Sequence, residues 1–340
     1  MTALPEPLSA PPATHDTGDA VLCEVLRWLH IGGALFLRAE FSAPWGYDSP
    51  PAEQLASLAD ALKPGARRLI LFHIIPDGHC TLSLDDGTSV LLAAGDVVIL
   101  PYSHPHRVAS DPDATPVPIT SLLPPMPWQT MPVIRHGGGG SGTQIVCGYL
   151  HSDDIMFHPV LGALPRLMHL KPGDSPLAQW VEASFRYALH ASELKRPVDD
   201  VLLQRLPELL FIECLRLYVR GGGREPQGWF AALDDPVVGR ALRLVHADYA
   251  RPWTLATLAR EAATSRSRLD ERFRRRLRIA PMQYLPQWRL QVAGQLLRTS
   301  MRGLADIADS VGYANEASLS RAFKRQTGVS PAAWRRGVSA

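Results

Sequence analysis

The segment GLADIADSVGYANEASLSRAFKRQTGVSPAAW, Gly303–Trp334, decides the fold of the C-terminal part of this 340-residue chain. Leu319 and Phe323 stand four residues apart, so a helix that carries both is expected to bury that face. Asn315 precedes the pattern and is a suitable N-cap. The opposite face of the predicted helix then exposes five side chains: Ala317, Ser318, Arg321, Lys324 and Arg325.

The same pattern occurs once more, upstream. Leu255, Leu258, Ala259 and Ala263 recur 49 residues later as Leu304, Ile307, Ala308 and Gly312, and Leu269, Phe273, Pro281 and Tyr284 recur 50 residues later as Leu319, Phe323, Pro331 and Trp334. Each copy predicts a helix-turn-helix, and Ser265 is the matching cap in the first. The exposed face of the first copy carries Ser267, Arg268, Asp270, Glu271 and Arg274.

Charge and spacing favour a nucleic acid as the partner of this repeat. Residues 229–340 hold 19 Lys and Arg against 9 Asp and Glu, a balance of +10, whereas the preceding residues hold 16 against 24, or −8. The helix predicted from Met282 to Leu297 would join the two copies rigidly. Such a rod allows two recognition helices to enter successive major grooves about 34 Å apart, so double-stranded DNA is the expected partner.

The N-terminal part has a different pattern. Between about Phe72 and Leu150, short runs of β-forming residues alternate with turns at Pro76-Asp77-Gly78 and Asp85-Asp86-Gly87, which predicts an antiparallel sheet or barrel. The stretches Pro112–Pro132 and Arg135–Gly142 are expected to be loops. The fold class is therefore α+β, with a β domain followed by a helical segment and an all-α C-terminal domain.

Two amphipathic helices are expected between the β domain and the repeat. One runs from Ser175 to Leu194, capped by Ser175, and the other from Val201 to Val219 despite Pro207. The second is either a core helix of the first domain or a helix that forms a dimer. Three glycines and a proline in Arg220–Trp229 indicate a linker. The predicted domains are 18–174, a helical and candidate dimerisation segment at 175–220, a linker at 221–228 and a DNA-binding domain at 229–340.

The C-terminal residues resemble the AraC/XylS family of transcription regulators. The match covers WTLATLAREAATSRSRLDERF, QWRLQVAGQLL and Gly303–Trp334, roughly 100 residues. It implies base-facing positions at Ser267, Asp270 and Glu271 in the first copy and at Ala317, Ser318 and Arg321 in the second. It also implies a one-component regulator of transcription, with RNA polymerase and a second copy of the chain as further partners.

The first copy departs from the pattern of that family in two ways. Arg278 stands where the family usually has a glycine, after the first recognition helix. Asp270 and Glu271 can accept from cytosine N4 but also repel phosphates. Since Arg321 can fork onto a guanine edge, base reading is assigned more firmly to the second copy than to the first.

The N-terminal part resembles a cupin-type effector domain of one branch of this family. GDVVILPYSHPHRV has the glycine, proline and histidine spacing of a cupin motif at Gly95, Pro101 and His106, with Ser103 at a position that is usually glycine. The resemblance implies a β-barrel from about Val21 to Leu170 that senses an effector, which is a small molecule, a metal ion or an oxidant.

His73, Cys80, His106 and Cys147 are the candidate effector residues, since they lie on predicted strands or their edges. If they meet, two histidines and two cysteines suit zinc or copper, and low-pKa thiolates suit oxidant sensing. The alternatives are buried cysteines with surface histidines, and a sugar-like or aromatic ligand stacked on Trp45 or Trp128. Cys23 and Cys214 are predicted to be core residues.

Several functional classes receive no support from the sequence. It contains no GxxxxGK[ST], HExxH or GxSxG motif, so an enzyme is not expected; a metal-dependent cupin enzyme with an accessory DNA-binding domain is the rival interpretation. The first residues lack a basic start followed by an apolar run, and no stretch approaches the roughly 20 apolar residues of a membrane span. A cytoplasmic protein without CxxC spacing or a disulfide framework is expected.

Overall fold

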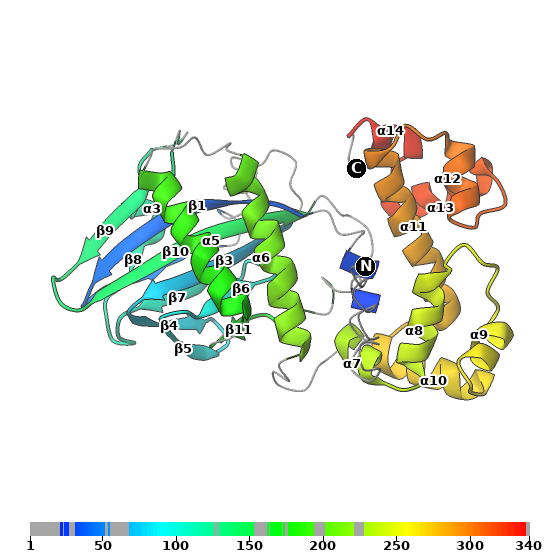
Figure 1. The fold of residues 1–340 in the computed structure, drawn as a ribbon, viewed down its shortest axis with the longest axis horizontal. Coiled ribbons are helices and arrows are strands. Elements are labelled where there is room, and N and C mark those ends of the chain that lie inside the picture. The colour runs from blue at the N-terminus through cyan, green and yellow to red at the C-terminus, as the bar shows by residue number, and fades with distance from the viewer. Residues whose placement is uncertain are drawn as a thin grey trace, which may run out of the picture.

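A computed structural model shows a β domain of two sheets followed by helices (Figure 1). The residues that it describes are 21–22, 24–26, 31–51, 54, 68–125, 128, 130–152, 162, 164–171, 173, 176–193, 201–220 and 228–337. The predicted class, a β domain joined to an all-α domain, is confirmed. Within this part of the chain, no helix is long and apolar enough to cross a membrane.

The expected barrel takes the form of two sheets rather than one closed cylinder. The first has the order β11 (Met168–Leu170), β6 (Val97–Leu100), β3 (Arg68–Asp77), β10 (Gly142–Ser152), β1 (Ile31–Ser42) and β9 (Val133–Gly137). The second has the order β5 (Ser89–Ala93), β4 (His79–Leu84), β7 (His106–Ala109), β2 (Gly46–Asp48) and β8 (Val117–Pro118). Side chains of both sheets share one apolar core between them.

Strand β3 shows how the six-stranded sheet serves two cores. Its residues alternate, so that Leu69, Leu71 and Ile75 join the core between the sheets, while Ile70, Phe72 and Ile74 join the core on the outer face. His73 belongs to the first set by this alternation. A histidine side chain therefore enters an otherwise apolar interior.

Three predicted connections differ from the structure, the first being Pro112–Pro132, which contains β8 and α3 (Ile119–Leu122) rather than a loop alone. Pro76-Asp77-Gly78 is a turn, with φ of +80° at Gly78, but β3 and β4 belong to different sheets and do not form a hairpin. Residues 135–137, expected in a loop, belong to β9, which pairs in parallel with β1. The pairing satisfies the backbone N–H and C=O groups of these residues, although the glycine-rich sequence that follows them favours a loop.

Helices α5 (Pro176–Glu193) and α6 (Val201–Arg220) cover the outer face of the six-stranded sheet (Figure 1). On α6, Leu210, Phe211, Cys214 and Leu215 are buried, so one face of this helix belongs to the core, and Cys214 is a core residue as predicted. Ser175, Cys23 and residues 221–227 of the predicted linker lie outside the described residues.

The C-terminal domain contains two helix-turn-helix units joined by one long helix. The helices are α7 (Gly228–Asp234), α8 (Val238–Ala247), α9 (Leu255–Glu261), α10 (Arg266–Leu277), α11 (Pro281–Thr299), α12 (Leu304–Ser310), α13 (Glu316–Thr327) and α14 (Pro331–Arg335). The units are α9–α10 and α12–α13, and α11 is the predicted rod. Large aromatic side chains, Trp229, Trp288 and Trp334 among them, are fully buried around α11.

Candidate functional site

Helix α13 presents the arrangement that the sequence predicts. Leu319 and Phe323 are 0% exposed, and the Asn315 side chain accepts the backbone N–H of Ser318 at 2.9 Å. Ala317 and Arg321 are exposed on the opposite face. Arg321 has no ion-pair or hydrogen-bond partner within the described part of the chain, so its guanidinium is available to a ligand. Lys324 and Arg325 are exposed one turn later.

Ser318 has a structural role in the same turn. Its hydroxyl donates to the Asn315 carbonyl at 2.7 Å and lies 3.3 Å from the Asn315 backbone N–H, which completes a capping box. A hydroxyl used in this way has a limited capacity to donate to a base edge. The sequence places Ser318 on the outer face without revealing this engagement.

The recognition helix of the first unit, α10, differs in its electrostatics. Ser265 caps it as predicted, and Ser267, Arg268 and Glu271 are exposed. Asp270 accepts from Arg274 Nε at 2.8 Å, so these two charges neutralise each other along the helix. The leading turn of α10 therefore offers less free positive charge than that of α13.

Two further arginines of α10, Arg272 and Arg276, point toward the interior of the domain. Arg272 Nη2 lies 2.7 Å and Arg276 Nε 3.4 Å from Asp235 Oδ2, and the Asp235 side chain is fully buried. The other oxygen, Asp235 Oδ1, accepts from two backbone N–H groups at the start of α8, those of Val237 and Val238. Burial would raise the pKa of Asp235, but Arg272 and the two N–H groups outweigh burial and hold this pKa below its usual value.

This ionic anchor is not predicted from the sequence. Arg272 and Arg276 lie three and seven residues after the buried Leu269, which is the helical spacing of an inner face. Arginine at such a position signals a buried acid nearby, but the sequence does not identify which acid.

Arg278 ends α10 in the left-handed conformation, with φ of +62°. Gly328 ends α13 in the same conformation, with φ of +82°. The resemblance had identified Arg278 as a residue at a glycine position, and the backbone here explains why glycine suits it. In the cupin motif, Ser103 likewise has φ of +51° where glycine is usual.

Three of the four candidate effector residues, His73, His106 and Cys147, meet between the two sheets. His73 Nδ1 lies 3.0 Å from Cys147 Sγ, and His73 Nε2 lies 3.0 Å from His106 Nε2. Both histidines are 6% exposed, Cys147 is 3% and Cys80 is 0%. The interpretation with surface histidines is therefore wrong, because His73 and His106 come from strands that face each other across the core.

The hydrogen atoms in the hydrogen-bonded series Cys147–His73–His106 can be assigned by starting from His106. His106 Nδ1 lies 2.9 Å from the His104 carbonyl oxygen, which can only accept, so Nδ1 carries the hydrogen. His106 Nε2 then accepts from His73 Nε2–H, and His73 Nδ1 accepts from the Cys147 thiol. Burial lowers the pKa of His106 to about 4 and that of His73 well below its usual value, which keeps both rings neutral.

The thiols of this cluster do not have the character that oxidant sensing favours. Burial raises the pKa of Cys80 and Cys147 to about 12. The Tyr47 hydroxyl lowers the pKa of Cys147 but does not cancel the effect of burial. The expectation of low-pKa thiolates is therefore wrong for the protein in this state. Burial and the two neighbouring thiols raise the pKa of Tyr47 well above its usual value.

The cluster is not arranged as a metal site. His73 directs its two nitrogens to different partners, and among the described residues no three His, Cys, Asp or Glu side chains are placed to hold one ion. Trp45 is also unsuited to stacking on a ligand, since it is 2% exposed and packs against Phe41 at 4.3 Å. The indole of Trp128 donates to the Pro124 carbonyl at 2.9 Å.

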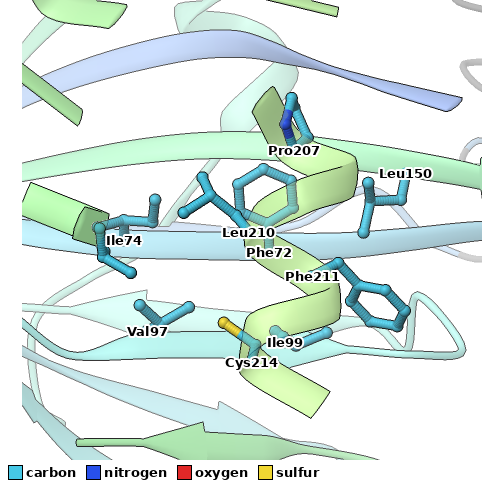
Figure 2. Close-up of a pocket in the computed structure, with 10 residues that line it drawn as sticks. Phe72, Ile74, Val97, Ile99, Leu150, Pro207, Leu210, Phe211 and Cys214 are labelled. Carbon is cyan, nitrogen blue, oxygen red and sulfur yellow. The ribbon is translucent and has the colours of Figure 1, made fainter. Parts of the chain in front are cut away.

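An apolar pocket lies outside this cluster, between the six-stranded sheet and the helices that cover it (Figure 2). Phe72, Ile74 and Leu150 line it from the sheet, and Leu210, Phe211 and Cys214 line it from α6. Its lining is almost wholly apolar, so it offers little to orient a polar ligand.

Comparisons with known proteins agree with this architecture. Residues 20–220 match the cupin family and residues 258–337 match a helix-turn-helix domain family. A putative AraC-like transcription regulator of Streptomyces lividans is 33% identical over 81% of this chain and 90% of its own length. The HTH-type transcriptional regulator AlkR of Acinetobacter baylyi is 31% identical over 79% of this chain and 89% of its own length.

Among solved structures, the DNA-binding domain of AdpA in complex with a target DNA is 33% identical over 31% of this chain and 93% of that chain, with a TM-score of 0.29. The relatives are transcription regulators, and they lend no support to the rival interpretation as a cupin enzyme. The chain belongs to the AraC-like family of transcription regulators, with an N-terminal ligand-sensing domain of the cupin family and a C-terminal helix-turn-helix domain that binds DNA.

Proposed function

We propose that the second helix-turn-helix unit reads base pairs and that the first chiefly holds the DNA backbone. The observation that carries this proposal is the free Arg321 guanidinium on the exposed leading part of α13. An arginine there can donate two hydrogen bonds to guanine O6 and N7 in the major groove, and the small Ala317 side chain permits close approach. Lys324 and Arg325 are placed to contact phosphates.

The role of α10 follows from its charges. Asp270 is neutralised by Arg274, and Glu271 adds an exposed negative charge at the leading turn. Arg268 and Ser267 remain exposed and can contact phosphate oxygens. We therefore assign a smaller share of sequence preference to the first unit.

The experiment selects a duplex from a random library with the full-length protein and measures its dissociation constant at rising salt. Specific binding that weakens with salt, and retention of the selected sequence over a shuffled one, are expected. Arg321→Ala and Arg240→Ala form a matched pair, because both arginines are exposed but Arg240 lies on α8, which is not a recognition helix. Equal loss of specificity in both variants would contradict the assignment.

The sensory role is proposed for the chain Cys147–His73–His106. It joins β10 and β3 of one sheet to β7 of the other through two 3.0 Å contacts, so a ligand or covalent change that breaks it alters how the sheets meet. A screen of small molecules, metal ions and oxidants for a shift in melting temperature identifies the effector class. Cys147→Ser is expected to abolish the shift, whereas Cys214→Ser, in the outer core, retains it.

Dimerisation through α6 completes the proposal. Leu202 and Leu209 are 58% and 51% exposed and lie seven residues apart, on one side of the helix. A second copy of the chain is the proposed occupant of this face, with RNA polymerase as the further partner at a promoter in the cytoplasm. Leu209→Lys is expected to lower the mass measured by light scattering from dimer to monomer; an unchanged mass would remove α6 from the interface.

A further inference from the structure

One arginine side chain connects the two helix-turn-helix units. Arg289 lies in the middle of α11, and its Nε donates to the Tyr249 carbonyl at 2.7 Å. Its Nη2 donates to the carbonyls of Ala250 and Arg251 at 3.1 and 2.8 Å, and its Nη1 donates to that of Gly312 at 2.9 Å. Three of these carbonyls belong to the loop before α9 and the fourth to the turn before α13.

Arginine is suited to this position in a way that lysine is not. The planar guanidinium carries five N–H donors in a fixed fork and here reaches four carbonyls of two separate segments at once. Burial lowers the pKa of Arg289, with Tyr313 and Asp248 acting in the opposite sense, but a guanidinium stays protonated at neutral pH. The charge strengthens each hydrogen bond to a carbonyl dipole.

The backbone of the two units also meets at this point. Gly312 has φ of +77°, and a Cβ added to it would lie 2.3 Å from the Ala250 carbonyl oxygen. The loop before α9 and the turn before α13 are therefore in direct contact beside the guanidinium. Unit two also packs on α11, where the Trp334 indole donates to the Gly294 carbonyl at 3.0 Å, and the contacts of Arg289 and Gly312 add a direct connection to the loop before α9.

We propose that Arg289 sets the spacing specificity of the protein, by fixing the rotation of unit two relative to unit one. Because B-DNA turns once in about 10 base pairs, one inserted base pair rotates a half-site by roughly 36° and moves it by 3.4 Å. A rigid pair of units tolerates only one such spacing. The inference rests on the proposed DNA reading by both units, since spacing matters only if both touch the same duplex.

The test uses the full-length chain and the duplex that it selects from a random library. Wild type, Arg289→Lys, Arg289→Met and the control Arg240→Met are titrated on this duplex and on versions with one and two base pairs inserted between the two protected segments. The wild type is expected to lose roughly 30-fold in affinity on the first insertion, since simultaneous engagement of both units is then lost. The Arg240→Met control is expected to behave in the same way.

Arg289→Met is expected to bind the selected duplex about tenfold more weakly than the wild type. Its affinity is expected to fall by less than about threefold on the insertion, because two flexibly joined units lose conformational entropy on binding at any spacing. Arg289→Lys should fall between the two. Circular dichroism melting confirms that each variant is folded; should Arg289→Met be unfolded, Arg289→Lys carries the comparison.

Two results would have different meanings. Weaker binding of both Arg289 variants by one factor on every spacing, with the wild-type insertion penalty preserved, overturns the clamp and leaves Arg289 as a stability residue. Failure of the wild type to select any duplex, or protection of one segment of the duplex only, contradicts the proposed binding of DNA by both units.

Discussion

Replacing Gly312 by alanine tests the contact between the two helix-turn-helix units. The added Cβ would lie 2.3 Å from the Ala250 carbonyl oxygen and 2.8 Å from Arg289 Nη2. Both distances are shorter than van der Waals contact, and one of the neighbours is backbone, which cannot move by rotating a side chain. The substitution must therefore displace one unit from the other.

The expected loss follows from two effects. The left-handed backbone at φ of +77° costs a residue with a Cβ roughly 1–2 kcal/mol relative to glycine. Overpacking against groups that cannot withdraw adds about 1–3 kcal/mol. We expect the free energy of unfolding of the C-terminal domain to fall by roughly 2–5 kcal/mol in Gly312→Ala.

Ala263 provides the matched control, because it holds the equivalent position of the first unit. It also has a left-handed backbone, with φ of +54°, but it is exposed. Ala263→Gly removes the strain of the left-handed backbone but also raises the conformational entropy of the unfolded chain, and these two effects oppose each other. The free energy of unfolding is therefore expected to change by less than about 1 kcal/mol.

Both variants are measured by urea unfolding of the full-length chain, followed by far-UV circular dichroism, with the melting temperature as a second measure. A Gly312→Ala variant whose free energy of unfolding stays within about 0.5 kcal/mol of the wild type would refute the reasoning. Such a result would mean that the two units are not pressed together at this turn.

Four further predictions concern single side chains. Arg321→Ala is expected to weaken binding to the selected duplex by about 1–3 kcal/mol and to relax preference at one base pair, measured on duplexes substituted at each position; the same loss on every sequence would make it a phosphate contact. Asp235→Asn should lower the free energy of unfolding by about 1–3 kcal/mol, because it removes the charge that two arginines of α10 face, while the exposed neighbour Asp234→Asn should not. Arg278→Gly should raise the melting temperature, since glycine adopts the left-handed C-cap without strain; a fall would show that the arginine side chain makes a compensating contact. The free energy of unfolding of the β domain should fall by up to about 3 kcal/mol as the pH falls from 7 toward 4. The reason is that His106 takes up a proton near pH 6.5 in the unfolded chain but only near its lowered pKa of about 4 in the folded chain. A pH profile that His106→Gln leaves unchanged would contradict this.

Local features of the DNA-binding domain could be predicted from the sequence. The buried faces of α10 and α13 follow from apolar spacing, and Ser265 and Asn315 are caps that act on neighbours three residues away. Such interactions lie within one turn of helix, so the order of residues determines them. The alternation along β4 of Cys80, Leu82 and Leu84 with Thr81 and Ser83 is equally local, and it points Cys80 inward.

Contacts across long sequence separations could not be predicted. His73 and Cys147 are 74 residues apart, and a register shift in β10 separates the pairs Gln144–Asp77 and Val146–Ile74, so counting along the strands does not align them. Arg289 is a second case, because its partners are backbone carbonyls. Every residue has a carbonyl, so no sequence pattern marks those that a guanidinium will find.

The two units differ in how their recognition helices are held in place, a difference that the repeated sequence pattern does not reveal. In α10, two arginines are committed to the buried Asp235 and a third to Asp270, so much of the positive charge of this helix serves to fix its own position. In α13, Arg321 is uncommitted, and the helix is positioned instead by its apolar face and by the backbone contact at Gly312. A unit anchored by its own charges suits a fixed reference on the DNA backbone, and a unit with a free guanidinium suits base reading. The two roles require a constant geometry between the units, and the four hydrogen bonds of Arg289 join the loop before one unit to the turn within the other.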